Sequence, residues 1–261
     1  MSWPESVGVL GCGAMGGAMA AGLAAGHPGI VANMVVADPD DAVRAGLAAE
    51  IGAAEGTIMA AARTDLVVVA VKPALVAGLL AEIRPALTDR SVVASVAAGR
   101  TLDDLDVAGC GTARLMPNLA VRHGAGLVAL ATRGIDDRRR DDLTAFLGVL
   151  GTVTELDEGL FDVATALAGS GPGIVALVAE ALEQGGIDEG LSAPDARAMV
   201  RAVLAGTAAL LADGLDPAEL RARVSSPGGT TVAAVQALEE GAVRRHLALA
   251  VRAAAARSGE L

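Results

Sequence analysis

The sequence predicts an N-terminal α/β domain with a mostly parallel sheet over residues 1–157 and an all-α domain over residues 158–261. Three observations predict this fold class. Short apolar runs alternate with helical patterns through the first part, which is typical of strands joined by helical crossovers. A glycine-rich turn follows the first of these runs. From Gly159 onward no segment has a convincing strand pattern, and helical periodicity fills the chain.

The expected strands are short and rich in β-branched residues, as buried parallel strands are. They cover Val7–Leu10, Met34–Ala37, 65–71, 91–96, 112–116, 126–131 and 151–156. The expected helices of the second domain cover 160–167, 174–184, 194–212, 217–224, 231–238 and 243–256. Residues 198–211 are apolar on most faces and must therefore be buried. A domain of about 100 residues has little interior for such a helix, so we expect a homodimer at minimum.

The glycine-rich turn has the spacing G-x-G-x-x-G. Gly11 permits the turn, Gly13 permits the approach of a pyrophosphate, and Gly16 lets helix and strand pack closely. The other loop residues are Cys12, Ala14 and Met15. Because a strand precedes the motif and a helix follows it, we expect a Rossmann-type domain that binds a dinucleotide.

Asp38 follows the second expected strand. An acidic residue at this place normally holds the adenosine ribose hydroxyls and repels the 2′-phosphate of NADP, which argues for NADH. Two observations keep the choice open. Asp38 precedes Pro39 and could simply cap the next helix, and Arg44 is near enough in sequence to reach a 2′-phosphate.

Composition and charge exclude several function classes. The formal net charge is −11, and the chain has two Phe, one Trp and no Tyr, whereas nucleic-acid binding needs basic surface and stacking aromatics. Cys12 and Cys110 are far apart and form no metal-ligand spacing, so we expect no metal site and a reducing, cytoplasmic location. We recognise no signal peptide and no run long enough to span a membrane.

A second turn opens into a helix at 225–231, with the sequence Ser-Ser-Pro-Gly-Gly-Thr-Thr. Pro227 and the two glycines permit a tight path, and we expect Thr230 and Thr231 to cap the helix that follows. A helix start with free N–H groups binds small anions. The alternative interpretation is a plain loop-to-helix turn.

Six segments then carry a resemblance. They are 11–16, 71–73, 95–99, 114–118, 169–172 and 225–231. Taken in this order, these segments resemble the pyrroline-5-carboxylate reductase family, and the resemblance covers nearly the whole chain. The block 225–231 is the most specific of the six. The resemblance implies a dinucleotide-binding domain, a helical dimerisation domain and higher oligomers, often five dimers in a ring.

The activity implied by this resemblance is NAD(P)H-dependent reduction of the cyclic imine 1-pyrroline-5-carboxylate to L-proline. The resemblance also places the functional residues. It implies cofactor contacts from Leu10, Gly11, Cys12, Gly13, Ala14 and Met15, from Ala70, Val71, Lys72 and Pro73, and from Ala97 and Ala98 at the nicotinamide end. Two further cofactor residues are expected on other grounds: Gly16 from the glycine motif and Asp38 from its place after the second strand. Substrate contacts are implied for Thr230, Thr231 and Glu158.

The chemistry of this reaction agrees with the residues. A protonated imine accepts hydride without a strong base, a metal or a lysine. It needs a donor near the ring nitrogen, for which Thr231 is the candidate catalytic residue, and a seat for its carboxylate. We expect that seat at the helix start, from Ser226, Gly228, Gly229 and Thr230. Glu158 could equally cap the first helix of the second domain.

Three positions depart from the family pattern. Leu119-Ala120 stands where Thr-Pro is usual, Gly173-Ile174 where Ala-Tyr is usual, and Ala14 where Asn or Gln is frequent. A related reductase of a different cyclic imine in secondary metabolism therefore stays open, as does a non-catalytic dinucleotide-binding oligomer. The β-hydroxyacid dehydrogenases use a lysine in the helical domain, and this chain has no lysine after Lys72.

Overall fold

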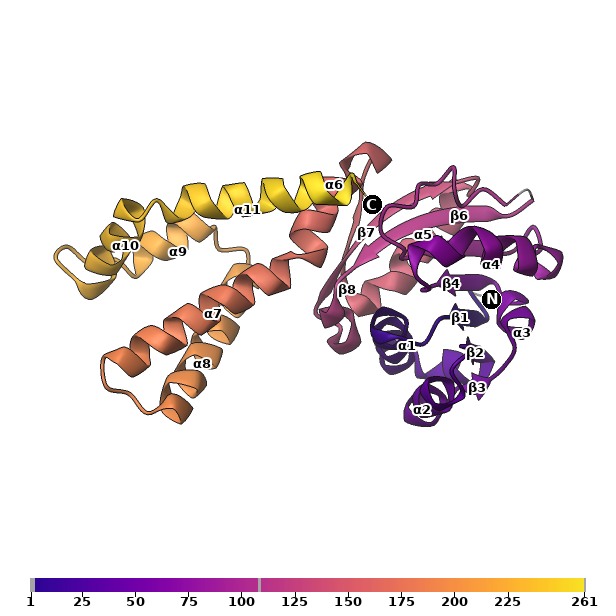
Figure 1. Ribbon diagram of the computed structural model, residues 1–261, viewed down its shortest axis with the longest axis horizontal. Coiled ribbons are helices and arrows are strands. Elements are labelled where there is room, and N and C mark those ends of the chain that lie inside the picture. The colour runs from indigo at the N-terminus through magenta and orange to yellow at the C-terminus, as the bar shows by residue number, and fades with distance from the viewer. Residues whose placement is uncertain (1–2, 108, 261) are drawn as a thin grey trace. The chain divides into compact units, whose positions relative to one another are not determined.

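The computed structural model describes residues 3–107 and 109–260. The chain folds as two compact units. The first unit runs to Gly169 and also contains the residues from Ala254 onward, and the second unit is Ser170–Ala253. Figure 1 shows the first unit as a sheet with helices packed on it and the second unit as helices alone.

The first unit is built on one eight-stranded sheet with the strand order β3-β2-β1-β4-β5-β6-β7-β8. The strands are β1 (Val7–Leu10), β2 (Met34–Ala37), β3 (Ala54–Glu55), β4 (Leu66–Val69), β5 (Val92–Ser95), β6 (Gly111–Pro117), β7 (Gly126–Arg133) and β8 (Gly151–Glu155). All neighbouring pairs are parallel except β6 and β7. The order reverses between β1 and β4, and sheets of this kind bind ligands outside the carboxyl ends of the strands at that point. The α/β fold class expected from the sequence is confirmed.

Both faces of the central strands are buried, which explains why their sequences are continuously apolar. Along β4, Leu66 and Val68 enter one core and Val67 and Val69 enter the other. Helices α1 (Ala14–Gly26), α2 (Asp41–Ile51) and α5 (Asp137–Leu147) cover the first face. Helices α3 (Ile58–Ala62) and α4 (Val76–Ile83) cover the second face, and Figure 1 shows α1 and α3 on opposite sides of β1.

A third cluster lies against β6 and β7, where α6 (Phe161–Ala164) follows the sheet. Phe161 is fully buried there with Leu102, Met116 and Ala129. A π-helical turn, Thr165–Gly169, continues α6. The chain returns to this place at its other end, because Ser258 Oγ donates to Asp162 Oδ1 over 2.8 Å.

The second unit consists of α7 (Gly171–Asp188), α8 (Ala193–Ala212), α9 (Pro217–Arg223), α10 (Thr230–Glu240) and most of α11 (Val243–Ser258). Among its described residues, Ala196 alone is buried. Large apolar side chains such as Leu177, Met199 and Val203 are more than half exposed. A layer of helices without a core cannot offset the conformational entropy of folding. Contacts with another chain are therefore needed to bury these faces.

One continuous helical stretch among the described residues, Glu158–Asp188, is long and apolar enough to cross a membrane by length and composition alone, with a mean hydropathy of 1.5. The sequence was expected to contain no such run. The π-helical turn interrupts the regular α-helix within this stretch, and Pro172 lies in the first turn of α7. Core and interface helices of globular proteins have the same composition.

We predict that Phe161→Ala lowers the free energy of unfolding of the first unit by about 3–5 kcal/mol, the usual cost of removing a fully buried phenylalanine. Chemical denaturation followed by circular dichroism measures this change. Leu160→Ala is the matched control, since Leu160 precedes it in the chain and is 49% exposed. Equal effects of the two substitutions would contradict the assigned core.

Candidate functional site

The glycine loop between β1 and α1 is held by two crowded contacts. Gly11 has a φ of +100°, and a Cβ there would lie 2.6 Å from the Ala70 carbonyl oxygen. A Cβ on Gly16 would lie 1.9 Å from the Gly11 carbonyl oxygen. Gly13 differs, because a Cβ there would meet no atom within 4 Å. The loop is thus closed towards the protein and open at Gly13, which fits the approach of a pyrophosphate.

The start of α1 offers backbone donors at the same place. Gly13 is the N-cap residue and no side chain caps the helix. The first N–H groups of a helix lack intrahelical partners and carry partial positive charge, so they bind phosphate groups. Gly13 and Ala14 are exposed, while Cys12 and Gly16 are buried. The geometry therefore fits a dinucleotide pyrophosphate at the loop.

Asp38 joins the end of β2 to the glycine loop. Its Oδ2 accepts a 2.7 Å hydrogen bond from the Cys12 N–H, and its Oδ1 accepts a 2.9 Å hydrogen bond from the Asp40 N–H. Asp40, not Asp38, caps α2, because its Oδ1 accepts from the N–H groups of Ala42 and Val43. The neighbouring Asp40 therefore has the capping role that the sequence left open for Asp38.

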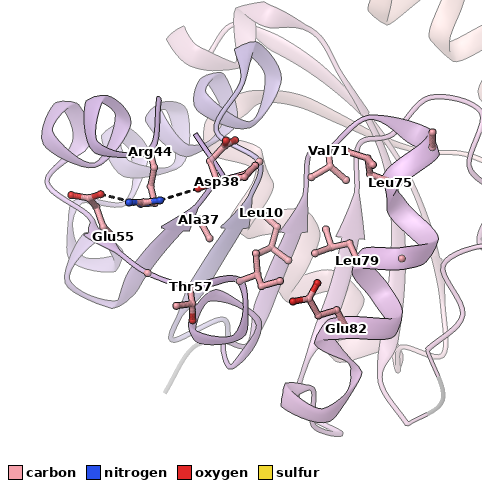
Figure 2. A pocket seen from close by; sticks show the side chains of 16 residues that line it. Leu10, Ala37, Asp38, Arg44, Glu55, Thr57, Val71, Leu75, Leu79 and Glu82 are labelled. Carbon is pink, nitrogen blue, oxygen red and sulfur yellow. Dashed lines mark hydrogen bonds and ion pairs between the residues drawn. The ribbon is translucent and has the colours of Figure 1, made fainter. Parts of the chain in front are cut away.

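A cavity of about 760 Å³ opens beside Asp38, at the carboxyl ends of β1 and β2. Figure 2 shows Asp38 and Arg44 on one side of it and Leu75, Leu79 and Glu82 on the other. Leu10, Ala37, Glu55, Gly56, Thr57 and Val71 also line it. Apolar walls with a carboxylate at the rim match an adenosine, whose flat base packs its faces against apolar side chains and whose ribose donates hydroxyl hydrogens.

The remaining expected cofactor residues follow β4 and β5. The Ala70 N–H donates to the Leu10 carbonyl oxygen over 2.8 Å, which brings the end of β4 against the glycine loop. Val71 and Pro73 are half-buried and Lys72 is exposed. Ala97 is buried, Ala98 is half-buried, and the Ala97 N–H donates to Ser95 Oγ over 3.2 Å. Small side chains after β5 leave room for a flat ring.

Glu158 lies at a contact between the sheet and the chain that follows it. Its Oε1 accepts a 2.6 Å hydrogen bond from the Leu102 N–H and lies 3.3 Å from Arg114 Nη1. The Arg114 side chain is 6% exposed, and its guanidinium stacks 4.5 Å from the centre of the Phe161 ring. The sequence did not indicate this buried arginine as a partner of Glu158. The ion pair between Arg114, in β6, and Glu158 holds the turn that follows β8 against β6.

The turn before α10 has the tight path expected from its glycines. Gly228 has a φ of +71°, and the Gly229 N–H donates to the Ser226 carbonyl oxygen over 2.9 Å. The expected capping by threonine is wrong: Gly229 is the N-cap residue and no side chain caps the helix. Thr230 and Thr231 are the first two helical residues instead. Among the described residues, no hydrogen bond occupies either hydroxyl, which leaves both available to a ligand.

Both parts of the chain are similar to known protein families. Residues 158–261 match the sequence profile of pyrroline-5-carboxylate reductase dimerisation, and residues 6–99 match that of NADP oxidoreductase, coenzyme F420-dependent. The pyrroline-5-carboxylate reductase of Methanosarcina acetivorans is 32% identical over 98% of both chains. That of Corynebacterium melassecola is 37% identical over 77% of this chain and 78% of its own. This chain belongs to the pyrroline-5-carboxylate reductase family.

Solved structures of the family share the fold. The reductase from Coxiella burnetii superposes with a TM-score of 0.90 at 26% identity, covering 98% of this chain and 97% of its own. The Plasmodium falciparum reductase, solved with NADP bound, superposes with a TM-score of 0.85 at 24% identity, covering 100% of this chain and 98% of its own. The Rossmann-type domain and the helical dimerisation domain expected from the sequence are therefore confirmed. The family assignment confirms the expected use of NAD(P)H.

The cavity also contains residues that were not expected from the sequence. Glu55 and Thr57 come from the two-residue strand β3 and the start of α3, and Leu75, Leu79 and Glu82 come from α4 and the turn before it. The spacing of Leu75, Leu79 and Glu82 by four and three residues places them on one helical face. That spacing was visible in the sequence, but nothing there indicated which face of the helix lines the cavity.

We predict that Gly16→Ala weakens NAD(P)H binding by at least about tenfold, because the methyl group would collide with the Gly11 carbonyl oxygen and displace the loop. Titration of cofactor fluorescence measures the dissociation constant. Gly46→Ala in α2 is the matched control, since a Cβ there meets no atom within 4 Å. Undiminished binding by the Gly16 variant would contradict the loop assignment.

We also predict that Cys12 is inert to alkylation. Burial, reinforced by the charge of Asp38, raises the pKa of the Cys12 thiol to about 11. At pH 8 only about one thiol in a thousand is then a thiolate, the reactive form. Mass spectrometry after brief iodoacetamide treatment should find Cys12 unmodified. Modification as fast as that of a free cysteine would contradict this environment.

Proposed function

We propose that this protein catalyses the NAD(P)H-dependent reduction of 1-pyrroline-5-carboxylate to L-proline, the last step of proline biosynthesis. One observation carries the proposal, the 32% identity with a pyrroline-5-carboxylate reductase over 98% of both chains. The glycine loop, the Asp38 carboxylate and the cavity beside it support it, because together they fit a dinucleotide.

The bound nicotinamide supplies the hydride. The residues of the glycine loop hold the pyrophosphate, Asp38 holds the adenosine ribose, and Ala97 and Ala98 leave space for the nicotinamide end. Orientation of the two bound reactants supplies much of the rate enhancement. No acid stronger than a hydroxyl is required, since the protonated imine carries its own positive charge.

The substrate residues we propose lie in the turn before α10. Backbone N–H groups at Gly228 and Thr230, with Ser226 beside them, receive the substrate carboxylate at a helix start that no side chain caps. Gly229 shapes this seat as the N-cap residue, since its own N–H donates to the Ser226 carbonyl oxygen. Thr231 donates a hydrogen bond to the lone pair that the ring nitrogen gains as hydride reaches the neighbouring carbon. Glu158 acts as an acidic group near the substrate, with Oε1 held by Leu102 and Arg114.

Residues 158–261 form the dimerisation and substrate domain in this proposal, and residues 1–157 form the cofactor domain. The exposed apolar faces of α7 and α8 are buried in a homodimer, since Ser170–Ala253 has almost no core of its own. This assignment also accounts for the apolar stretch Glu158–Asp188, which needs no membrane. Five dimers in a ring, a cytoplasmic location and the absence of nucleic-acid partners complete the proposal.

A second candidate, reduction of a different and less polar cyclic imine, has one observation in its favour. Leu119 follows β6, where the family usually has a threonine, and its side chain is 58% exposed. An exposed leucine offers an apolar surface, which favours an apolar ligand. Rapid turnover of 1-pyrroline-5-carboxylate with weak activity on larger imines would exclude this candidate.

The first test is consumption of NADH and of NADPH with DL-pyrroline-5-carboxylate, followed by absorbance at a fixed protein concentration. We expect stoichiometric formation of proline with at least one cofactor. Cofactor binding without any imine-dependent consumption would contradict the proposed reaction, and larger cyclic imines would then become the substrates to examine.

A second test concerns Thr231. Thr231→Ala should lower kcat by roughly one to two orders of magnitude, the usual effect of removing one positioned donor. Thr231→Ser keeps the hydroxyl and is the matched control, with kcat near that of the original protein. Full turnover by the alanine variant would show that another group donates at the ring nitrogen.

A further inference from the structure

Two residues at the cavity rim give opposite indications about the cofactor. Asp38 at the end of β2 is the residue type that receives a ribose 2′-hydroxyl, which NADH has and NADPH lacks. Arg44 in α2 is the residue type that accommodates a 2′-phosphate. Both line the same cavity. The sequence alone left the choice between NADH and NADPH open, and the contacts of Arg44 favour NADH.

Arg44 is already bound to protein oxygens. Its Nε donates to Glu55 Oε2 over 3.0 Å, as Figure 2 shows. Its Nη1 donates to the Asp38 carbonyl oxygen over 3.0 Å and lies 2.8 Å from Asp41 Oδ1. These contacts to Asp41 and Glu55 raise the pKa of Arg44 further above its usual range.

A guanidinium grips a phosphate through one of two forks, either Nε with Nη2 or Nη1 with Nη2. In this structure the first fork has Nε on Glu55, and the second has Nη1 on Asp41 and the Asp38 carbonyl. Each two-pronged contact with a 2′-phosphate would therefore have to displace a carboxylate or a carbonyl oxygen. Only single contacts through Nη2 remain without such competition.

The charge of the rim acts in the same direction. Asp38, Glu55 and Glu82 line the cavity with carboxylates, against the single guanidinium of Arg44. Arg44 donates to the backbone of Asp38 and not to its carboxylate, so the Asp38 charge stays beside the ribose position. A 2′-phosphate would add about two negative charges among these groups, which repel it.

We propose that the cavity selects NADH over NADPH, and that Glu55 is the specificity-determining residue that holds Arg44 away from a 2′-phosphate. The sheet fixes Glu55 for this role. Strand β3 pairs Glu55 with Val36, and the next residue, Gly56, donates from its N–H to the Val36 carbonyl oxygen over 3.0 Å. This inference rests on the proposed function for the identity of the cofactor site.

Binding measurements on the full-length protein test the inference without relying on turnover. The original protein should bind NADH about tenfold or more tightly than NADPH, and 5′-AMP more tightly than 2′,5′-ADP. Glu55→Gln removes one negative charge and weakens the hold on Nε of Arg44, because a neutral amide oxygen is a poorer acceptor than a carboxylate. It should tighten NADPH and 2′,5′-ADP binding by about three- to tenfold and leave NADH within about twofold.

Glu50→Gln is the matched control, because Glu50 lies in the same helix as Arg44, pairs with Arg122 and does not line the cavity. Glu50→Gln makes the same change of charge and should leave the dissociation constants of NADH and NADPH unchanged. Asp41→Asn is a second variant, which removes the charged one of the two acceptors of Nη1 and should also favour NADPH. A preference of the original protein for NADPH, or an unchanged cofactor ratio in Glu55→Gln, would overturn the inference.

The same protein samples separate this inference from the proposed function. Tight NADH binding without reduction of 1-pyrroline-5-carboxylate would remove the proposed reaction and support the selectivity. Reduction of the imine with NADPH in preference to NADH would support the reaction and overturn the selectivity.

Discussion

The hydrogen bond from the Cys12 N–H to Asp38 Oδ2 is the interaction on which the proposed cofactor site depends. It ties the glycine loop after β1 to the end of β2, and the Gly11 N–H strengthens the same connection by donating to the Ala37 carbonyl oxygen over 2.8 Å. The Asp40 N–H holds the other carboxylate oxygen. One aspartate thus orients the loop and carries the charge at the proposed ribose position, so loop geometry and the proposed cofactor choice are coupled.

The second unit is stabilised in a different way. Its helices expose most of their apolar side chains, and Ala196 is the single buried residue among those described in Ser170–Ala253. Folding of such a segment is linked to association, so its stability depends on protein concentration. Glu158, held by Leu102 and Arg114, and Asp162, held by Ser258, fix the two ends of the helical region within the first unit.

Much of this fold followed from the sequence because its strands are apolar on both faces and its turns contain glycine. The two-residue strand β3 was missed, since Ala54 and Glu55 are exposed and have no pattern of their own. This omission hid the partner of Arg44, which is why the sequence could not decide between the two cofactors. The capping of α10 by threonine failed because Gly229 takes the N-cap position, a shift of one residue that periodicity cannot resolve.

The most direct measurement is a crystal structure of the full-length protein with NADH bound. We expect the adenosine in the cavity beside β2, with a ribose hydroxyl within hydrogen-bonding distance of the Asp38 carboxylate and with Glu55 still paired to Arg44. An adenosine outside this cavity, or an Arg44 side chain turned from Glu55 towards the cofactor phosphates, would contradict the proposed cofactor site.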